Sequence, residues 1–466
     1  MNEFGISRLL GVFAFITIYL LGQTIGGIFC SPISEVFGRR TIYIVAATAF
    51  GISSVIVAVP NHVAGVFVGR FFQGVSASIP VTVAFGNFSD MFDADKRIWV
   101  VYAYTLFGMA GLALGPVYSS FVTLTLGWKW VHHISAIASG ISVVCCLFIK
   151  ESNASQILQA KAKVLSARTG NSRLKAKDNS PHSKHPLRDF IQSNLYRPLT
   201  FLFTEPLVTL CAILCATAFG LIYGLTESLT IVYTSPPFDN TFDETTSSLT
   251  FLAILVGELI NIFPRFYDER LLERQRTLHR RIEPETKIRS FALACPTLAI
   301  GLWLFAWTIP QRVPNVPSSI SMLGLICIGF SANDFSYVLF GYITDAYGFY
   351  AASAVSSLST ARTLTAAIFP LFMTQMYEGL GNNVATSVLA AVAILFCFTP
   401  IVFLRYGKRL REKSQWAVKG EDALVDENKH LEDHEMHDRR MSGERAGIQS
   451  SHGTEPGDVQ HERSIV

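Results

Sequence analysis

The side chains best placed to carry chemistry in this chain are polar residues inside long apolar stretches. Ionisable groups at membrane depth are costly and rare, so each one is a candidate functional residue. Arg70 lies inside such a stretch, three positions before Gln73. A buried guanidinium needs several acceptors to offset its desolvation, which leaves two interpretations. Arg70 either takes part in proton coupling or a structural pair inside the protein, or it lies near the outer membrane interface, where its guanidinium reaches water.

A second polar cluster lies in the apolar stretch that contains Tyr223 and Glu227. These two residues are four positions apart and share one helical face, beside a face formed by Gly220 and Gly224. That combination suits a helix that lines a polar cavity, where a buried carboxyl group could exchange protons near neutral pH. The alternative is a position at the outer end of the helix, open to water.

The third cluster consists of Asn333, Asp334 and Tyr337, midway along another apolar stretch. Asp334 and Tyr337 share a helical face, and a carboxylate in the middle of a span is hard to explain as a surface residue. We therefore expect a cavity role for this cluster. Glu258, which follows Gly257 in a further apolar stretch, is a weaker candidate.

The stretches that hold these clusters predict an all-α polytopic membrane protein. Half of the 466 residues are hydrophobic and 16% are charged, below the roughly 25% that is typical of soluble domains. The net charge of +3 is too small to indicate a nucleic acid partner, and the eight cysteines show no metal-ligand spacing, so we expect the lipid bilayer as partner and no metal or cofactor. Eleven segments are long and apolar enough to span the bilayer: 9–29, 41–59, 63–87, 98–122, 131–149, 207–233, 247–265, 291–309, 318–343, 350–376 and 384–404.

Basic residues are distributed unequally between the two sides of these spans. The loops of one side hold most of the lysines and arginines, whereas those of the other side hold Lys129 and Arg312. The positive-inside rule therefore places the 150–206 connection, the 265–290 loop and the C-terminal tail in the cytosol. We expect a five-span half at 1–149, a basic linker at 150–206, a six-span half at 207–404 and a disordered tail at 405–466.

Two octapeptides indicate that the halves are related. Residues 85–92 end the third span, and residues 340–347 end the ninth, 255 positions later, with three identical and three conservative positions. Parallel helical repeats are an established transporter architecture. In this register the 207–233 helix has no counterpart, because its partner would precede Met1.

Several ordered motifs resemble the major facilitator superfamily. The turn Ser31-Pro32-Ile33-Ser34-Glu35-Val36-Phe37-Gly38-Arg39-Arg40 resembles the loop between the second and third family helices, in the form typical of fungal twelve-helix drug:proton antiporters. Further matches are Gly69-Arg70-Phe71-Phe72-Gln73-Gly74 to the R-F-x-Q-G motif, Trp128-Lys129-Trp130 to the start of the sixth helix, and Tyr350 to Ala354, Arg362 and Phe369-Pro370-Leu371-Phe372 to the eleventh.

This resemblance implies roles for residues in both halves. It assigns Arg70 to proton coupling, and it implies a cytosolic gate whose charges latch neighbouring helices and separate as the site opens inward. Charge pairs at a wet interface contribute about 0–1 kcal/mol each, which suits a latch that opens in every cycle. The expected gate residues are Glu35, Gly38, Arg39, Arg40, Asp90 and, in the second half, Asp345 against Arg270 or Arg362.

The fifth family helix departs from the antiporter pattern G-P-x-x-G-P-x-x-G-G. Gly115-Pro116 is kept, but Gly111 is followed by Leu112, and Ser119-Ser120 stands where two glycines are expected. Small residues at these positions let helices pack closely. The departure leaves the direction of transport open. The chain also looks like a facilitator without its first family helix, for which we favour a truncated gene model or transcript.

We predict a plasma-membrane monomer that exports small amphipathic or cationic organic compounds in exchange for protons. The expected coupling or cavity residues are Arg70, Gln73, Tyr223, Glu227, Asn333, Asp334 and Tyr337. One alternative is a truncated membrane protein that does not transport and acts as a remnant, a sensor or an interaction partner. Another is a membrane enzyme built on His132-His133, which lacks nearby carboxylate partners and is disfavoured.

Overall fold

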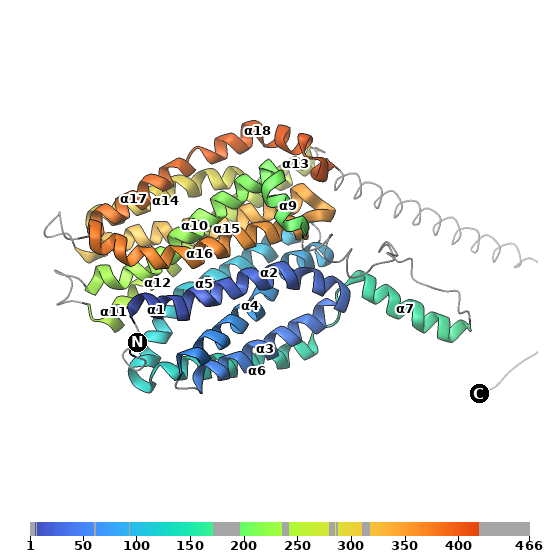
Figure 1. Ribbon diagram of the computed structural model, residues 1–466. Helices are drawn as coiled ribbons and strands as arrows, with labels where there is room; N and C mark the ends of the chain where they lie inside the picture. Colours follow the sequence, from blue (N-terminus) through green and yellow to red (C-terminus); the bar gives the residue numbers. More distant parts are fainter. Residues whose placement is uncertain are drawn as a thin grey trace, which may run out of the picture.

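The computed structural model describes residue 5 and residues 7–59, 62–92, 94–170, 196–234, 242–278, 285, 288–309 and 317–418. Every regular element within these residues is a helix, which confirms the predicted fold class. Figure 1 shows two helical bundles, one running from α1 to α6 (blue to cyan) and the other from α10 to α18 (green to red). The predicted linker (150–206) and tail (405–466) are described only in part, because residues 171–195 and 419–466 lie outside the described residues. The described start of the predicted tail is helical rather than disordered, since helix α18 runs from Thr399 to Lys413.

The first bundle begins with a short α-helix that continues into a π-helix and then into a long α-helix. Its elements are α1 (Arg8–Val12), the π-helix η2 (Phe13–Thr17), α2 (Ile18–Phe37), α3 (Arg39–Ala58), α4 (Val63–Met91), α5 (Ala94–Leu126) and α6 (Trp128–Phe148). The projecting helix is α7 (Ala154–Thr169) (Figure 1).

The second bundle begins with a short helix and contains two helices of 30 residues. Its elements are α9 (Tyr196–Thr204), α10 (Pro206–Thr234), α11 (Glu244–Ser247), the 3-10 helix η5 (Ser248–Thr250), α12 (Phe251–Ile260), α13 (Ile262–Thr277), α14 (Ile288–Thr308), α15 (Ser318–Tyr347), the 3-10 helix η7 (Gly348–Tyr350), α16 (Ala351–Leu380), α17 (Asn382–Phe396) and α18 (Thr399–Lys413).

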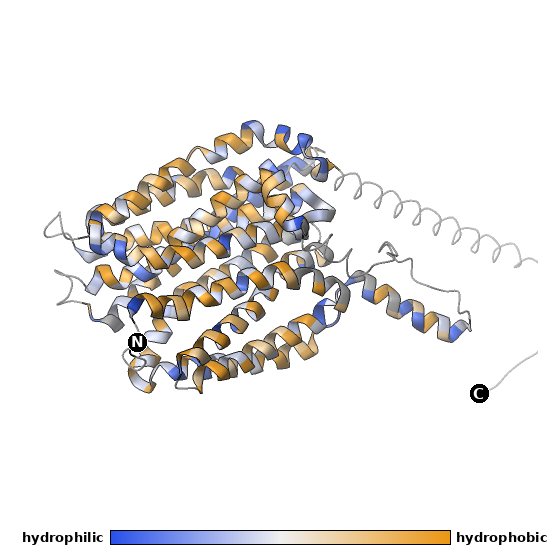
Figure 2. Ribbon diagram, in the orientation of Figure 1, coloured by the Kyte–Doolittle hydropathy of each residue, from blue (hydrophilic) through white to orange (hydrophobic). Residues whose placement is uncertain are grey.

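Ten helical segments of the described chain are long and apolar enough to cross a bilayer. The one predicted span outside these ten is 350–376, which corresponds to α16; this helix is long enough but carries many serine and threonine residues as well as Arg362. This less apolar composition is tolerated because α16 packs between α10 and α2 rather than against lipid alone. Figure 2 shows apolar residues along both bundles and alternating polar and apolar residues along α7.

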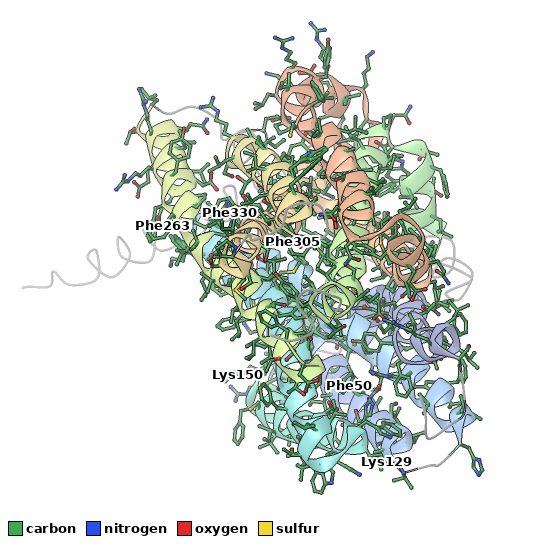
Figure 3. The ribbon with its side chains drawn as sticks, turned by 90° about the vertical axis from the view of Figure 1, so that its left-hand side faces the viewer. Phe50, Lys129, Lys150, Phe263, Phe305 and Phe330 are labelled. Atoms are coloured by element: carbon green, nitrogen blue, oxygen red, sulfur yellow. The ribbon has the colours of Figure 1, made fainter. Side chains whose placement is uncertain are left out.

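The helix ends correct the sequence-based boundary at Arg265. That residue was assigned to the start of a basic loop, but the chain continues as helix α13 to Thr277, and one candidate span runs from Thr245 to Gln275. Arg265 is fully buried in this span. In Figure 3, Phe263 of α13 and Phe330 of α15 lie in the second bundle, while Phe50 and Lys129 lie in the first.

The two bundles repeat one packing scheme. In the first bundle α4 packs on α2 and α3, and in the second α15 packs on α12 and α14. Between the bundles α2 contacts α16, α5 contacts α12, and α4 contacts α16. The central interface is therefore lined by α2, α4 and α5 on one side and by α12, α15 and α16 on the other.

Glycines at repeat-related positions allow the closest helix contacts. A methyl group added to Gly74 on α4 would overlap the carbonyl oxygen of Tyr19, and one added to Gly329 on α15 would overlap that of Ile254. Gly74 and Gly329 are also 255 positions apart. Their matching contacts support the repeat, because small residues are what permit helix backbones to approach in a membrane.

The repeat-related residues Phe85 and Phe340 meet at the centre of the molecule. Their ring centroids are 5.0 Å apart, and the rings are inclined by only 18°. Phe85 belongs to α4 and Phe340 to α15, so this stacked pair joins the two bundles. The same offset that relates the octapeptides in the sequence thus relates two side chains in direct contact.

Candidate functional site

Two ends of the molecule serve to place the site. At one end of the molecule α3 begins and α4 and α6 terminate; we call this the Arg39 end. At the other end α1 begins and α10 terminates; we call this the Arg8 end. Of the predicted cavity residues, Glu227 lies at the Arg8 end and the others lie between the two ends. The predicted gate residues lie at the Arg39 end.

A buried ionic cluster around Arg265 occupies the contact between α13 and α15. Nη2 of Arg265 lies 2.6 Å from Oδ1 of Asp334, and Nη1 lies 2.8 Å from Oδ2 of Asp268. The guanidinium also stacks over Tyr337, with 4.4 Å from Cζ to the ring centroid. The predicted cluster of Asn333, Asp334 and Tyr337 is thus brought together, but its carboxylate is already neutralised by an arginine.

Asn333 extends this cluster by amide hydrogen bonds. Its Nδ2 donates to Oδ1 of Asn261 at 3.2 Å, and Nδ2 of Asn261 donates to the carbonyl oxygen of Phe330 at 3.0 Å. Sequence reasoning missed Arg265 and Asp268 as members. The available signal was their spacing of three residues in a stretch without a turn residue between them, which places both on one helical face.

Arg70 is held inside the first bundle by rings and amides. Its guanidinium lies 5.8 Å from the ring centroids of Phe15 and Tyr19, and Nη1 donates to Oε1 of Gln73 at 3.4 Å. Gln73 is buried, and its Nε2 donates to Oγ of Ser54 at 2.7 Å. This arrangement favours the interpretation of Arg70 as an interior residue, and its role in proton coupling stays a prediction.

Glu227 lies at the Arg8 end of α10, as the alternative interpretation expected. Its Oε1 is 3.3 Å from Nη2 of Arg8, and the two side chains are 19% and 46% exposed. Tyr223, one turn earlier, instead packs on the small apolar cluster around Leu20 that joins the two bundles. The shared helical face therefore holds one residue at a wet end and one residue in the central interface.

The Arg39 end is organised by an acidic residue that sequence reasoning did not single out. Gly38 has a φ of +87°, a conformation that favours glycine, and α3 begins immediately after it. Glu151 accepts hydrogen bonds from the backbone N–H groups of Arg39 at 2.9 Å and Arg40 at 3.1 Å. The Glu151 carboxylate therefore caps the N-terminus of α3, where the helix dipole also favours a negative charge.

The arginines of this turn bind neighbouring helices through carbonyl groups. Nη1 of Arg39 donates to the carbonyl oxygen of Val83 on α4 at 3.1 Å, and Nη2 of Arg40 donates to that of Leu147 on α6 at 2.8 Å. The helices that Glu35 and Asp90 belong to are described, but their side chains lie outside the described residues. The predicted gate is therefore placed in part.

Burial raises the pKa of Glu151, but backbone N–H donors from Asn153, Arg39, Arg40 and Ser152 outweigh that effect and hold the pKa below its ordinary value of 4.5. A carboxyl group with a depressed pKa in the folded state stabilises the fold above its unfolded pKa and loses that contribution as the pH falls through the folded pKa.

Replacing Glu151 by Gln is therefore expected to lower the free energy of unfolding by about 1 kcal/mol at neutral pH, the usual cost of losing a helix cap. The difference from the wild type should shrink as the pH falls below about 4.5, the ordinary pKa of this group, and disappear only below the lower pKa that Glu151 has in the folded protein. Thermal unfolding of the purified full chain at a series of pH values measures this. An equal difference at pH 7 and pH 3.5 would contradict the capping role.

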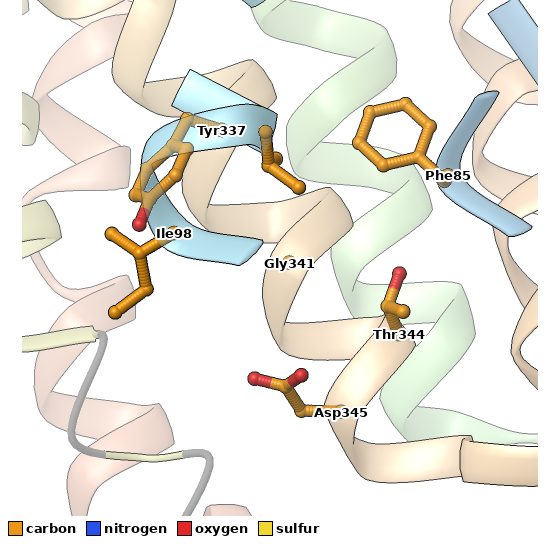
Figure 4. Close-up of a pocket in the computed structure, with 7 residues that line it drawn as sticks. Phe85, Ile98, Tyr337, Gly341, Thr344 and Asp345 are labelled. Atoms are coloured by element: carbon orange, nitrogen blue, oxygen red, sulfur yellow. The ribbon is translucent and has the colours of Figure 1, made fainter. Parts of the chain in front are cut away.

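A small pocket lies between the bundles, on the side of the stacked phenylalanines toward the Arg39 end. Figure 4 shows Tyr337, Gly341 and Asp345 following one another along α15, with Phe85 on the neighbouring helix α4. Asp345, a predicted gate residue, thus lies at the edge of a pocket shared by both halves. The lining residues are Phe85, Ile98, Val101, Tyr337, Gly341, Thr344 and Asp345.

Glu258, the weaker candidate of the sequence, is the most completely buried isolated carboxyl group near the interface. Its side chain is 2% exposed, and within the described residues its Oε2 has no hydrogen-bond partner. It lies on α12, the helix that contacts α5 of the other bundle. An ionised carboxylate in such a site is costly unless water or a cation reaches it.

The glycines of α5 face open space in the described structure. A methyl group added to Gly108, Gly111 or Gly115 would meet no described atom within 4 Å. In the second bundle the comparable helix, α16, is covered by α10, and Phe369 and Met373 lie against Gly220 and Gly224. Pro116 lies inside α5, and the role predicted for this helix in antiport remains a prediction.

The histidine pair provides no sign of an enzyme centre. His132 is buried against Trp128, with ring centroids 6.1 Å apart in an edge-on arrangement. The part of the chain that the structure describes contains no group of three or more His, Cys, Asp or Glu residues that could hold a metal ion.

Arg362 of α16 is a functional candidate that the sequence marked through a motif match and as one of two candidate partners of Asp345. Its guanidinium lies over two aromatic rings, 4.4 Å from the centroid of Phe219 on α10 and 5.2 Å from that of Phe340 on α15. Sequence reasoning suggested Arg362 as a partner of Asp345, but its contacts in the structure are these rings. Within the described residues its Nε has no hydrogen-bond partner.

Comparison with known proteins identifies the family to which this chain is similar. The sequence profile of the Major Facilitator Superfamily matches residues 1–370. The chain is 29% identical to "Efflux pump FUB11" of Gibberella moniliformis, over all of this chain and 78% of that protein. It is 30% identical to "Multidrug transporter TPO1_2" of Candida glabrata, over 86% of this chain and 69% of that protein.

Solved structures agree with the fold. The crystal structure of the human organic anion transporter MFSD10 (TETRAN) superposes with a TM-score of 0.59 at 16% identity, covering 84% of this chain and 83% of that one. The proton:xylose symporter XylE superposes with a TM-score of 0.57 at 16% identity, covering 86% and 88%. At these identities the likeness concerns the fold alone.

Proposed function

We propose that this chain, which belongs to the Major Facilitator Superfamily, exports small amphipathic organic compounds in exchange for protons by alternating access. Membership of the family makes the chain a membrane transporter and sets the enzyme alternative aside. Export as the direction is supported by the names of its relatives, which are efflux pumps and multidrug transporters. Rocking of two related bundles about a central site is the mechanism that such repeats serve.

The observation that carries proton coupling is the position of Glu258. Its buried carboxyl group lies on α12, a helix that contacts α5 of the opposite bundle, and its charge reaches Tyr102 of α5. A movement that separates these helices would wet the carboxyl group, and the charged form costs much less in water than in a dry contact. Release and uptake of a proton at Glu258 would then follow the conformational cycle.

Orientation and assembly are further parts of this proposal. Basic residues at the Arg39 end, such as Arg39, Arg40 and those of α13, support a cytosolic position for that end. We place the protein in the plasma membrane as a monomer. The central 150–206 connection and the C-terminal tail then lie in the cytosol, as the distribution of charges predicts.

The predicted preference for cationic compounds loses its main support. That preference relied on carboxylates in the cavity, but Asp334 is paired with Arg265, and Glu227 is paired with Arg8 at the end of its helix. We therefore propose amphipathic compounds as substrates. The sign of the charge that they carry depends on interior residues without an ion-pair partner among the described residues.

Reconstituted vesicles test the proposal. Full-length protein in liposomes with an acidic interior should accumulate at least one of three matched probes, 1-naphthoate, 1-naphthamide or 1-naphthylmethylammonium, above the level in protein-free liposomes with the same pH difference, which corrects for passive trapping of the amine. Replacing Glu258 by Gln should reduce proton-driven accumulation at least tenfold, while Glu412→Gln, at an exposed position on α18, should leave it unchanged. Accumulation of none of the probes, or an active Glu258→Gln variant, would contradict the proposal.

A rival function is favoured by one observation, the open face of α5. The comparable face of α16 is covered by α10, whereas no described atom lies within 4 Å of a methyl group at Gly111 or Gly115. A cavity that lacks one wall would not isolate its contents from lipid or water. The chain would then act as a membrane protein that binds without transporting, and the vesicle experiment separates these two functions.

A further inference from the structure

We propose that Arg362 and the aromatic rings around it form a binding site for an organic anion, a compound with one carboxylate or sulfonate group on an apolar body. The inference rests on the proposed function, because it names the class of substrate for the same central interface. It concerns the sign of the substrate's charge and the residue that recognises it.

Aromatic residues from both bundles converge on Arg362. Arg362 comes from α16, Phe219 from α10 and Phe340 from α15, and the guanidinium lies over both rings. Phe85 of α4 stacks on Phe340, and Tyr104 of α5 meets Phe85 edge-on with 5.6 Å between centroids. Five helices from both bundles therefore contribute to one aromatic cluster with a single guanidinium, which we call the Arg362 cluster.

The guanidinium of Arg362 is the second feature that points to a ligand. Among the described residues Arg362 takes part in none of the ion pairs, and its Nε has no hydrogen-bond acceptor. An arginine in the middle of a span is costly, so an uncompensated one indicates a substrate pathway or site. The contacts with rings lower this cost only in part, because within the described residues they leave the Nε–H group without an acceptor.

The ionisable residues near Arg362 determine which sign of charge a ligand can bring to it. Asp334 and Glu227 are each held by an arginine, whereas Arg70 also lacks an ion-pair partner among the described residues. The central region as a whole is not positive, because Arg265 has two carboxylate partners and Glu258 is a further carboxyl group near the interface. The Arg362 cluster itself, however, contains a guanidinium and no carboxylate among its members. Such a cluster repels an organic cation and attracts an anion.

The chemistry of the cluster completes the recognition. A guanidinium presents parallel N–H donors that fit a carboxylate or sulfonate in a bidentate manner. The rings of Phe219, Phe340 and Phe85 offer an apolar surface for the body of the same molecule. The charge of Arg362 also reaches the hydroxyl group of Tyr223, which can donate a further hydrogen bond to an anion.

Binding to purified protein tests this inference without requiring transport. The full chain in detergent is titrated with 1-naphthoate, and with 1-naphthamide and 1-naphthylmethylammonium as neutral and cationic matches. We expect naphthoate to bind at least tenfold more tightly than either match. Arg362→Gln should abolish that preference, Arg362→Lys should restore part of it, and Arg409→Gln, at an exposed position on α18, should leave it intact.

Three results would overturn the inference: equal or tighter binding of the ammonium probe, an unchanged preference in Arg362→Gln, or binding of none of the three probes. Recovery of naphthoate binding in Arg362→Lys shows that the glutamine variant failed through its lost charge rather than through misfolding. Transport of the ammonium probe by vesicles would keep the proposed function while refuting the anion site. Binding of naphthoate without any transport would keep the site while refuting the proposed function.

Discussion

Replacing Arg265 by Gln is expected to lower the free energy of unfolding by about 3–5 kcal/mol, the cost of removing one partner from a buried ion pair. Two carboxylates, those of Asp334 and Asp268, would lose their counter-charge at once. Arg265 and Asp334 are both fully buried, so water cannot replace the lost partner without opening the contact between α13 and α15. Reversible unfolding in mixed micelles measures the change.

The matched control lies five residues further along the same helix. Arg270 is exposed on α13, and Arg270→Gln should change the free energy of unfolding by less than about 0.5 kcal/mol. A loss for Arg265→Gln no larger than for Arg270→Gln would show that the cluster is hydrated in the membrane-embedded protein. A double variant, Arg265→Met with Asp334→Leu, should recover part of the loss, because an apolar pair leaves one stranded carboxylate fewer.

Substituting alanine for Gly74 or Gly329 is expected to destabilise the protein by about 1–3 kcal/mol, and valine by more, because the added atoms overlap backbone rather than a flexible side chain. The carbonyl oxygens of Tyr19 and Ile254 belong to helices α2 and α12, which must move away as whole elements. Since the two glycines are repeat-related, the two losses should be similar.

Gly140→Ala on α6 is the control for these substitutions, because no described atom lies within 4 Å of its added methyl group. This change should be neutral or stabilising, as alanine is favoured over glycine in a helix by about 1 kcal/mol. Unfolding of Gly74→Ala or Gly329→Ala in the same range as Gly140→Ala would contradict the close helix contacts on which the repeat rests.

Much of the fold could be predicted from the sequence, because its physical determinants are local. Apolar stretches of membrane length identify helices wherever they occur, and α16 could be included although Arg362 and its hydroxyl residues reduce its hydropathy. The octapeptides at Phe85 and Phe340 indicated the relation between the halves, and the stacked rings agree with it. Neither inference required knowledge of a distant partner.

The sites were harder to predict because they depend on contacts between distant residues. Arg265 was assigned to a loop since basic residues near the end of a span usually face water, and its partner Asp334 is 69 residues away. Glu151 caps a helix that begins 112 residues earlier. The ambiguity of Glu227 was settled by Arg8, a residue 219 positions away. No local pattern contains these pairings.

The stacked rings of Phe85 and Phe340 lie where the two related halves of the chain meet. In a symmetric dimer of half-chains, a residue next to the two-fold axis meets its own copy, so an arginine introduced there would face a second arginine across the axis. A single chain with two halves is free of that restriction. The ring of Phe340 lies against the guanidinium of Arg362, whereas the ring of the matching Phe85 meets the phenol ring of Tyr104 edge-on. Joining the halves in one polypeptide thus permits one guanidinium at the contact between the halves without a second, repelling guanidinium opposite it.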